Sequence, residues 1–139
     1  MPSLSRCARI RRSVVHADHV IEVGHRRPNQ PAPPHVLFEA LARPDRDPAR
    51  PWLLLLDDEQ RPAVLAATSP ELVVWSSLWT RRPDATVRFD LAPDASGRGT
   101  ALRWTLLVSP PEPEPALPGH LRKRLNELIN ANLRFTFGQ

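Results

Sequence analysis

Hydrophobic and polar residues alternate along four consecutive stretches of the chain, residues 61–68, 72–80, 85–91 and 100–108. Alternation places successive side chains on opposite faces of a β-strand, so each stretch is predicted to be a strand. The breaks between them contain Pro, Asp, Ser and Gly, which are typical of turns. Residues 19–26 are rich in β-branched side chains and are predicted to be an earlier strand. Short connections between the four stretches predict an antiparallel meander.

Two stretches show helical spacing instead. Pro34 precedes the first of them, residues 35–42, and proline is favoured at the first position of a helix. The second covers residues 119–135, after a proline-rich linker. Its apolar face carries Leu121, Leu125, Leu128, Ile129, Asn132 and Leu133. Its opposite face carries Arg122, Lys123, Arg124, Glu127 and Arg134, which are expected to meet water.

This order of elements predicts an α+β domain. A curved antiparallel sheet of about five to six strands would wrap around the long C-terminal helix, with one or two short helices after the first strand. The apolar run at residues 51–57 is either a buried turn of helix or a further strand. Residues 18–139 are expected to form this single domain.

Two segments add a family resemblance to this element order. The sequence APPHVLFEALARP, residues 32–44, is similar to the opening of the first helix in the SRPBCC superfamily. The sequence FDLAPDASGRGTALRWTLL, residues 89–107, is similar to a strand, hairpin and strand of that superfamily. The segments at residues 73–79 and 122–139 resemble a narrower bacterial group within it. The resemblance implies the helix-grip fold of START-like and polyketide cyclase-like domains.

Large apolar side chains gather on one face of the predicted sheet, the face that would meet the C-terminal helix. Its tryptophans are either core residues or walls of a ligand cavity, and the sequence leaves both open. Asn132 interrupts the apolar face of the helix, so it should bond to backbone, water or a bound molecule. The residues predicted to line a cavity are Trp75, Ser77, Trp79, Phe89, Trp104, Leu106, Leu125, Ile129 and Asn132.

Candidate catalytic chemistry is sparse. The five histidines are scattered without the spacing of a metal site, so neither a metal nor a cofactor is predicted. Glu22 and His25 lie three apart in the first strand and are expected to face opposite sides. Gly-x-Ser-x-Gly, P-loop and dinucleotide-binding motifs do not occur. No catalytic residue is therefore assigned, and the sequence leaves enzymatic activity open.

The charge distribution decides against nucleic acid as a partner of the folded domain. The net charge is +4, and residues 1–17 contain four arginines and no acidic residue. The remaining fifteen basic residues are balanced by fifteen acidic ones. Residues 1–17 are predicted to be a disordered basic tail, which also contains the single cysteine, Cys7. The chain contains neither an apolar run long enough to span a bilayer nor a secretory signal, so a cytoplasmic location is expected.

These observations favour non-catalytic binding or carriage of a hydrophobic, lipid-like or polyketide-like molecule between the sheet and the C-terminal helix. One alternative is a small cyclase or dehydratase in which Glu22, His25 or Arg103 moves a proton. Another is a chaperone-activator-like protein-interaction module, whose partner the sequence does not identify. A cavity of roughly 300 Å³ or more beside Trp75, Phe89 and Trp104 would favour ligand binding. A filled interior would favour the interaction module.

Overall fold

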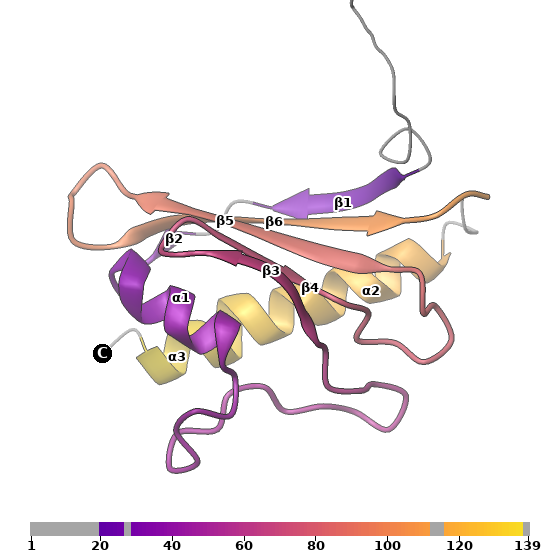
Figure 1. Cartoon of the computed structure of the whole chain (residues 1–139), viewed down its shortest axis with the longest axis horizontal. Helices are drawn as coiled ribbons and strands as arrows, with labels where there is room; N and C mark the ends of the chain where they lie inside the picture. Colours follow the sequence, from indigo (N-terminus) through magenta and orange to yellow (C-terminus); the bar gives the residue numbers. More distant parts are fainter. Residues whose placement is uncertain (1–19, 27–28, 112–115, 138–139) are drawn as a thin grey trace, which may run out of the picture.

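The computed structural model describes residues 20–26, 29–111 and 116–137, so the predicted tail at residues 1–17 lies outside it. One antiparallel sheet lies against a long C-terminal helix, and the first helix lies on the same side of the sheet (Figure 1). This is the helix-grip arrangement that the sequence predicts. Within the described residues, no helix is both long enough and apolar enough to cross a membrane.

The sheet has the spatial order β1-β6-β5-β4-β3, and β2 pairs with β6 off this path. Every pairing is antiparallel, as expected for strands joined by hairpins. The strand β3 has β4 as its neighbour on one side and forms an edge of the sheet. The strands are β1 (Ile21–Arg26), β2 (Asn29–Gln30), β3 (Val64–Thr68), β4 (Leu72–Trp75), β5 (Thr86–Pro93) and β6 (Thr100–Val108).

The predicted strand at residues 72–80 is too long, because β4 ends at Trp75. The Ser77 hydroxyl then accepts a hydrogen bond from the Trp79 N–H at 3.0 Å, which holds the backbone in a loop. The predicted strand at residues 61–68 begins three residues later than expected. Residues 51–57 form neither the helix nor the strand that the sequence left open.

The helices are α1 (Pro34–Ala42) and a C-terminal run of α2 (Ala116–Asn126), the π-helical segment η2 (Glu127–Leu133) and α3 (Arg134–Phe137). Pro34 occupies the N-terminal end of α1, as predicted. Gln30 is buried and donates from Nε2 to the Ile129 carbonyl oxygen at 3.1 Å. This contact connects β2 to the π-helical segment, where the regular α-helical hydrogen bonding is interrupted.

The core lies between the inner face of the sheet and the C-terminal helix. The alternation along β5 and β6 is confirmed, because Val87, Phe89, Leu102 and Leu106 are all fully buried. From the helix, the core takes Leu121, Leu125, Leu128, Ile129 and Leu133. At about 25 cal/mol per Å² of apolar surface, burying each such side chain contributes roughly 1.5–3 kcal/mol, before the entropy of ordering it is counted. This packing holds the helix on the sheet.

One side chain of the expected water-facing side of the C-terminal helix is buried instead. Arg124 is 7% exposed, and its Nε lies 2.7 Å from Oε2 of Glu59. Arg124 also donates to the carbonyl oxygen of Leu54. The segment that precedes β3 therefore covers this side of α2, and the ion pair explains how a guanidinium can be buried there.

Glu22 and His25 also depart from the prediction, because they do not face opposite sides of β1. Nδ1 of His25 lies 2.6 Å from Oε2 of Glu22. The pairing of β1 with β6 changes register between Glu22 and Gly24, so strict alternation does not hold across this bulge. Both side chains are largely exposed, and the pair lies on the surface of the protein.

Candidate functional site

The structure brings six of the predicted cavity residues together as packed core. Trp75, Phe89, Trp104, Leu106, Leu125 and Ile129 are each at most 1% exposed. The Trp75 indole N–H donates to the Leu41 carbonyl oxygen at 2.8 Å, and its ring meets Phe89 edge to face at 4.7 Å. The pockets described below are not lined by any of these six side chains. Their role in binding stays a prediction.

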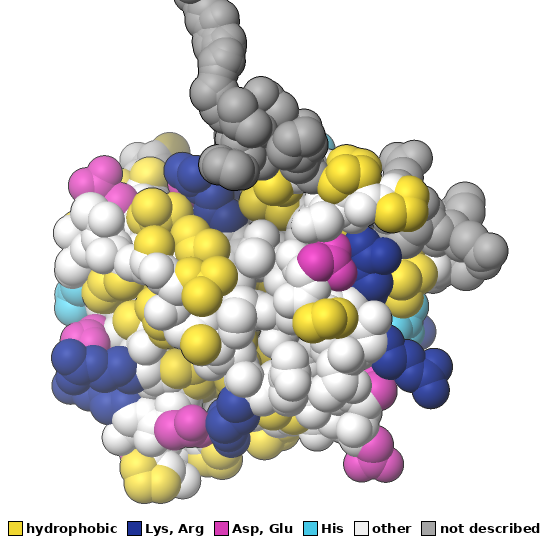
Figure 2. Space-filling view, turned by 45° about the vertical axis from the view of Figure 1, so that its right-hand side comes forward, with side chains coloured by type: hydrophobic (Ala, Val, Ile, Leu, Met, Phe, Trp, Pro, Cys, Tyr) yellow, Lys and Arg dark blue, Asp and Glu magenta, His cyan; other side chains and the backbone are white. Residues whose placement is uncertain are grey.

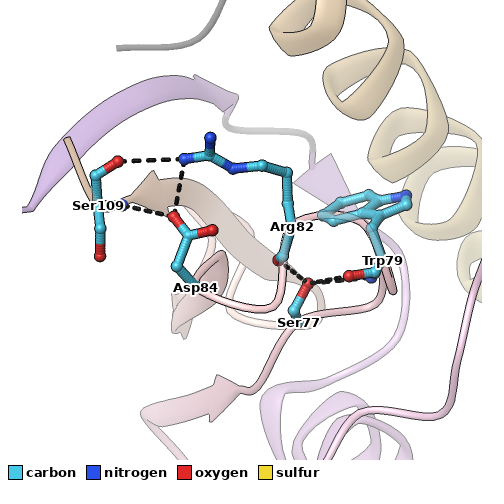
Figure 3. A network of polar contacts seen from close by, with 5 residues as sticks. All are labelled: Ser77, Trp79, Arg82, Asp84 and Ser109. Carbon is cyan, nitrogen blue, oxygen red and sulfur yellow. Dashed lines mark hydrogen bonds and ion pairs between the residues drawn. The ribbon is translucent and has the colours of Figure 1, made fainter. Parts of the chain in front are cut away.

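Ser77 and Trp79 lie in the loop between β4 and β5, in a polar network that Figure 3 shows. The Ser77 hydroxyl lies 2.6 Å from the carbonyl oxygen of Arg82 and 3.1 Å from that of Trp79. Arg82 in turn contacts Asp84 at 2.8 Å, and Asp84 accepts the N–H of Ser109 at 2.8 Å. All of these hydrogen bonds are between groups of the protein itself. They fasten the loop to the end of β6.

Asn132 is half-buried and does not lie within the apolar face of the helix. It lines a shallow groove of about 760 Å³ together with Leu54 and Phe135, which are 55% and 77% exposed. The π-helical segment carries Asn132, and its wider turn changes which residues face the sheet. A prediction that assumes regular α-helical spacing misplaces a residue here.

A deeper pocket of about 410 Å³ opens beside α1, and we refer to it as the α1 pocket. Val36 and Ala40 lie one helical turn apart on α1 and form one wall. Trp52 and Phe137 contribute aromatic walls from distant parts of the chain. The full lining is His35, Val36, Glu39, Ala40, Arg43, Pro44, Arg46, Asp47, Arg50, Trp52 and Phe137.

Trp52 connects this pocket to the core. Its ring stacks on Trp75 with centroids 6.0 Å apart and an interplanar angle of 27°. Trp52 is 1% exposed, and its indole N–H has no hydrogen-bond partner among the described residues. Trp52 thus contacts both the packed interior, where the sequence predicts a cavity, and the α1 pocket.

Charged side chains surround the apolar walls of the α1 pocket. Arg46 lies 3.6 Å from Glu39. Arg50 donates from Nη2 to the Thr136 carbonyl oxygen at 2.5 Å, and its guanidinium carbon lies 4.5 Å from the centre of the Phe137 ring. A cation over an aromatic face is attracted by the ring quadrupole. Arg50 therefore fixes the last turn of the C-terminal helix against the pocket.

The α1 pocket was not predicted from the sequence, although the loop that forms part of its lining could be recognised from composition. Residues 43–50 contain three arginines and two aspartates between prolines, a composition that predicts a loop and nothing about its contacts. Phe137 lies near the other end of the sequence, so no local pattern predicts that it contacts the loop at residues 43–50. Trp52 lies in the apolar run whose structure the sequence left open.

Two of the three residues named for proton transfer line a hollow on the outer face of the sheet, and the third, His25, contacts Glu22 at 2.6 Å. Glu22 and Arg103 line a shallow hollow of about 790 Å³ with Arg88 and Asp90. Arg88 and Asp90 pair with each other at 3.0 Å, and both are about half exposed. Across residues 20–26, 29–111 and 116–137, no three His, Cys, Asp or Glu side chains gather as a metal site. The hollow offers no enclosed site that would exclude water from a reaction.

Comparisons with known proteins bear on the fold. No protein-family model matches the sequence, and no curated protein matches it either. The structure is similar to the crystal structure of CalU16 from Micromonospora echinospora, with a TM-score of 0.58 and 17% identity over 82% of this chain and 70% of CalU16. It is also similar to the solution structure of the Aha1 dimer from Colwellia psychrerythraea. That TM-score is 0.58, with 12% identity over 82% of this chain and 94% of the other. At this identity the likeness establishes the helix-grip fold alone.

Proposed function

We propose that this protein binds a small molecule with an apolar body in the α1 pocket. The carrying observation is a cavity of about 410 Å³ whose walls include Val36, Ala40, Trp52 and Phe137. A volume of some 300–1,000 Å³ with apolar and aromatic walls is typical of small-molecule sites. The packed interior meets the criterion that favours an interaction module over a ligand between sheet and helix; the hydrophobic ligand is kept in this proposal because the α1 pocket, a different cavity, has room for it.

The fold supports this proposal in a general way, because the helix-grip arrangement is the one implied by the resemblance to the SRPBCC superfamily. The core is filled by Trp75, Phe89 and Trp104, so a ligand between sheet and helix would have to displace packed side chains. Displacing buried aromatic groups costs several kcal/mol. The α1 pocket requires no such displacement. Binding of a small molecule is the function that it fits.

Titration with the neutral dye N-phenylnaphthylamine, whose fluorescence rises in apolar sites, tests the proposal. Val36→Trp would fill the pocket, and Val20→Trp makes the same change at a residue that is 43% exposed and outside the pocket lining. We expect the first variant to bind the dye at least about tenfold more weakly and the second to match the parent protein. Equal binding by all three proteins would refute the proposal. Ala40→Leu, a smaller filling change, replaces Val36→Trp if that variant does not fold.

A second candidate function, self-association, is favoured by the exposure of β3. All five of its residues are exposed, including Val64 and Leu65 at 39% and 57%. Residues 62–68 carry no charge, whereas exposed edge strands are usually protected by charged side chains. Figure 2 shows hydrophobic side chains reaching the surface in the middle of one face, with most charged side chains toward its margins.

A second copy of this chain is the partner that such a strand fits. Antiparallel pairing of β3 with itself would place uncharged residues opposite uncharged residues and would use backbone groups on its open edge. The Aha1 neighbour is itself a dimer. Light scattering over a range of concentrations should show a dimer that Leu65→Lys dissociates and Leu56→Lys, on an exposed loop, does not. A monomer at every concentration would exclude this candidate.

A further inference from the structure

We infer that the ligand of the α1 pocket carries an anionic, acceptor-rich group beside its apolar body; this inference rests on the proposed function. The charged side chains in the pocket lining are three arginines and two acids, with one histidine in addition. Carboxylate, sulfonate and phosphate groups are the partners that guanidinium groups bind best, since two parallel N–H donors can meet two oxygens.

The three arginines of the lining outnumber its two acids by one, so the charge of the pocket is positive with His35 neutral, and both acids have contacts of their own. Glu39 lies 3.6 Å from Arg46. Oδ1 of Asp47 accepts the backbone N–H of Ala49 at 3.1 Å. By contrast, the guanidinium of Arg43 has neither an ion pair nor a hydrogen bond within the part of the chain that the structure describes. Arg43 is therefore a cation at the pocket without a partner among the described residues.

The groups of the pocket wall that lack partners are donors. The Trp52 indole N–H is buried and unpartnered within the described residues, and an indole nitrogen can only donate. A buried donor without an acceptor destabilises the folded protein, so an acceptor that reached it would be stabilising. A hydrocarbon could not pair with Arg43, whereas an anion has acceptor oxygens for it.

Arg50 is held in advance. Its bond to the Thr136 carbonyl oxygen and its position over the Phe137 ring restrict a side chain that otherwise has many rotamers. Binding of an anion to Arg50 therefore costs less side-chain conformational entropy than binding to an unrestrained arginine. With Val36 and Ala40 forming an apolar wall on α1, the pocket places apolar surface next to cations. This combination fits an amphiphilic anion.

Two dyes with the same ring system test the inference on the full chain. Anilinonaphthalene sulfonate carries an anionic group, and N-phenylnaphthylamine lacks it. We expect Arg43→Gln to weaken sulfonate binding by about fivefold to tenfold and to leave neutral-dye binding within about twofold. Arg61→Gln is the matched control, because Arg61 is more than half exposed, pairs with Asp45 at 2.8 Å and lies outside the pocket lining. Raising salt from about 0.05 M to about 0.5 M should weaken only the sulfonate.

The outcomes separate the two proposals. One outcome is that the neutral dye binds as tightly as the sulfonate dye and that Arg43→Gln changes the affinity for neither dye. That outcome would overturn the inference of an anionic ligand and leave the α1 pocket as a binding site. Sulfonate binding that Val36→Trp does not weaken would place the anion elsewhere and also overturn the inference. If neither dye bound, the proposed function itself would fail. Equal effects of Arg43→Gln and Arg61→Gln would show general surface charge, not recognition in the pocket.

Discussion

Glu59 and Arg124 form an ion pair in the interior, with Oε2 and Nε 2.7 Å apart and side chains that are 0% and 8% exposed. Glu59 also accepts the backbone N–H of Leu56 through Oε1 at 2.9 Å. Arg124 reaches the Leu54 carbonyl oxygen from the same guanidinium. Both charged groups therefore have hydrogen bonds besides their own pairing, which is what a buried pair needs to offset its desolvation. The pair fastens the segment before β3 to α2.

Breaking this pair should be costly. Glu59→Gln would remove the close counter-charge of the buried Arg124 guanidinium and leave it only the half-exposed carboxylate of Glu127 at 3.6 Å, and such a loss typically destabilises a protein by about 3–5 kcal/mol. Urea denaturation measures the change in the free energy of unfolding. Asp45→Asn is the control, because Asp45 pairs with Arg61 at a similar distance but both are exposed, and it should cost at most about 1 kcal/mol. Equal losses would contradict a special role for the buried pair.

Trp75→Ala should be among the most destabilising substitutions in the core. The side chain is fully buried, packs on Trp52 and Phe89, and donates a hydrogen bond to Leu41. Its truncation would leave a large cavity and an unpaired carbonyl, for a loss of about 3–5 kcal/mol measured by chemical denaturation. Leu65→Ala, on exposed β3, should change the free energy by no more than about 0.5 kcal/mol. A mild Trp75→Ala would mean that the interior can collapse around the gap.

Two glycines should respond to alanine in opposite directions. A Cβ at Gly99 would overlap the Gln30 carbonyl oxygen and the carboxylate of Asp94, so Gly99→Ala should force the hairpin and β2 apart. A Cβ at Gly119, within α2, would meet no atom of the described residues within 4 Å apart from its chain neighbours and the backbone of its own helix. Gly119→Ala should therefore stabilise the protein by about 0.5–1 kcal/mol through helix propensity. Thermal unfolding compares the two variants, which carry the same change from glycine to alanine. Shifts of the unfolding temperature in the same direction would contradict the prediction.

Acid should weaken the hairpin between β5 and β6. A hydrogen bond from the Ser96 hydroxyl lowers the pKa of Asp94 below its ordinary 3.8. Partial desolvation of the carboxylate opposes this shift, and hydrogen bonds from the N–H groups of Gly99, Ser96 and Gly97 add to it. A lowered pKa contributes stability above the unfolded value, and this stability is lost as pH falls through the folded value. Between neutral pH and the region below 3.8, the parent protein should therefore lose more stability than Asp94→Asn. Urea midpoints across this range measure it, and parallel pH curves for the two proteins would contradict the assignment.

The sheet was predictable because its strands obey a local rule. Along β6, Thr100, Leu102, Trp104, Leu106 and Val108 are all buried, as their alternation predicts. The rule failed where the backbone stops being extended. The Ser77 hydroxyl bonds to neighbouring backbone groups and ends the strand before Trp79, and side chains that compete in this way leave no trace in a hydrophobic pattern. The bulge in β1 and the π-helical turns also change which residues share a face, and the hydrophobic pattern does not reveal either of them.

The α1 pocket was less predictable for a different reason. Its walls come from α1, from an irregular loop and from Phe137, and only the fold brings these together. Arg124 shows the same limit, because its burial depends on a segment more than sixty residues away that covers one side of α2. Periodicity identifies which face of an element is apolar. It does not identify which polar residue a distant loop will cover.

Trp52 belongs to the core through its stack with Trp75 and to the α1 pocket through its wall. A substitution at this residue would therefore change the shape of the pocket and the packing of the core together. Arg43 and Arg46 carry no such double constraint, because they are exposed and border the pocket at its margin. Among related sequences, ligand preference should diversify at the rim of the pocket while its aromatic floor stays fixed.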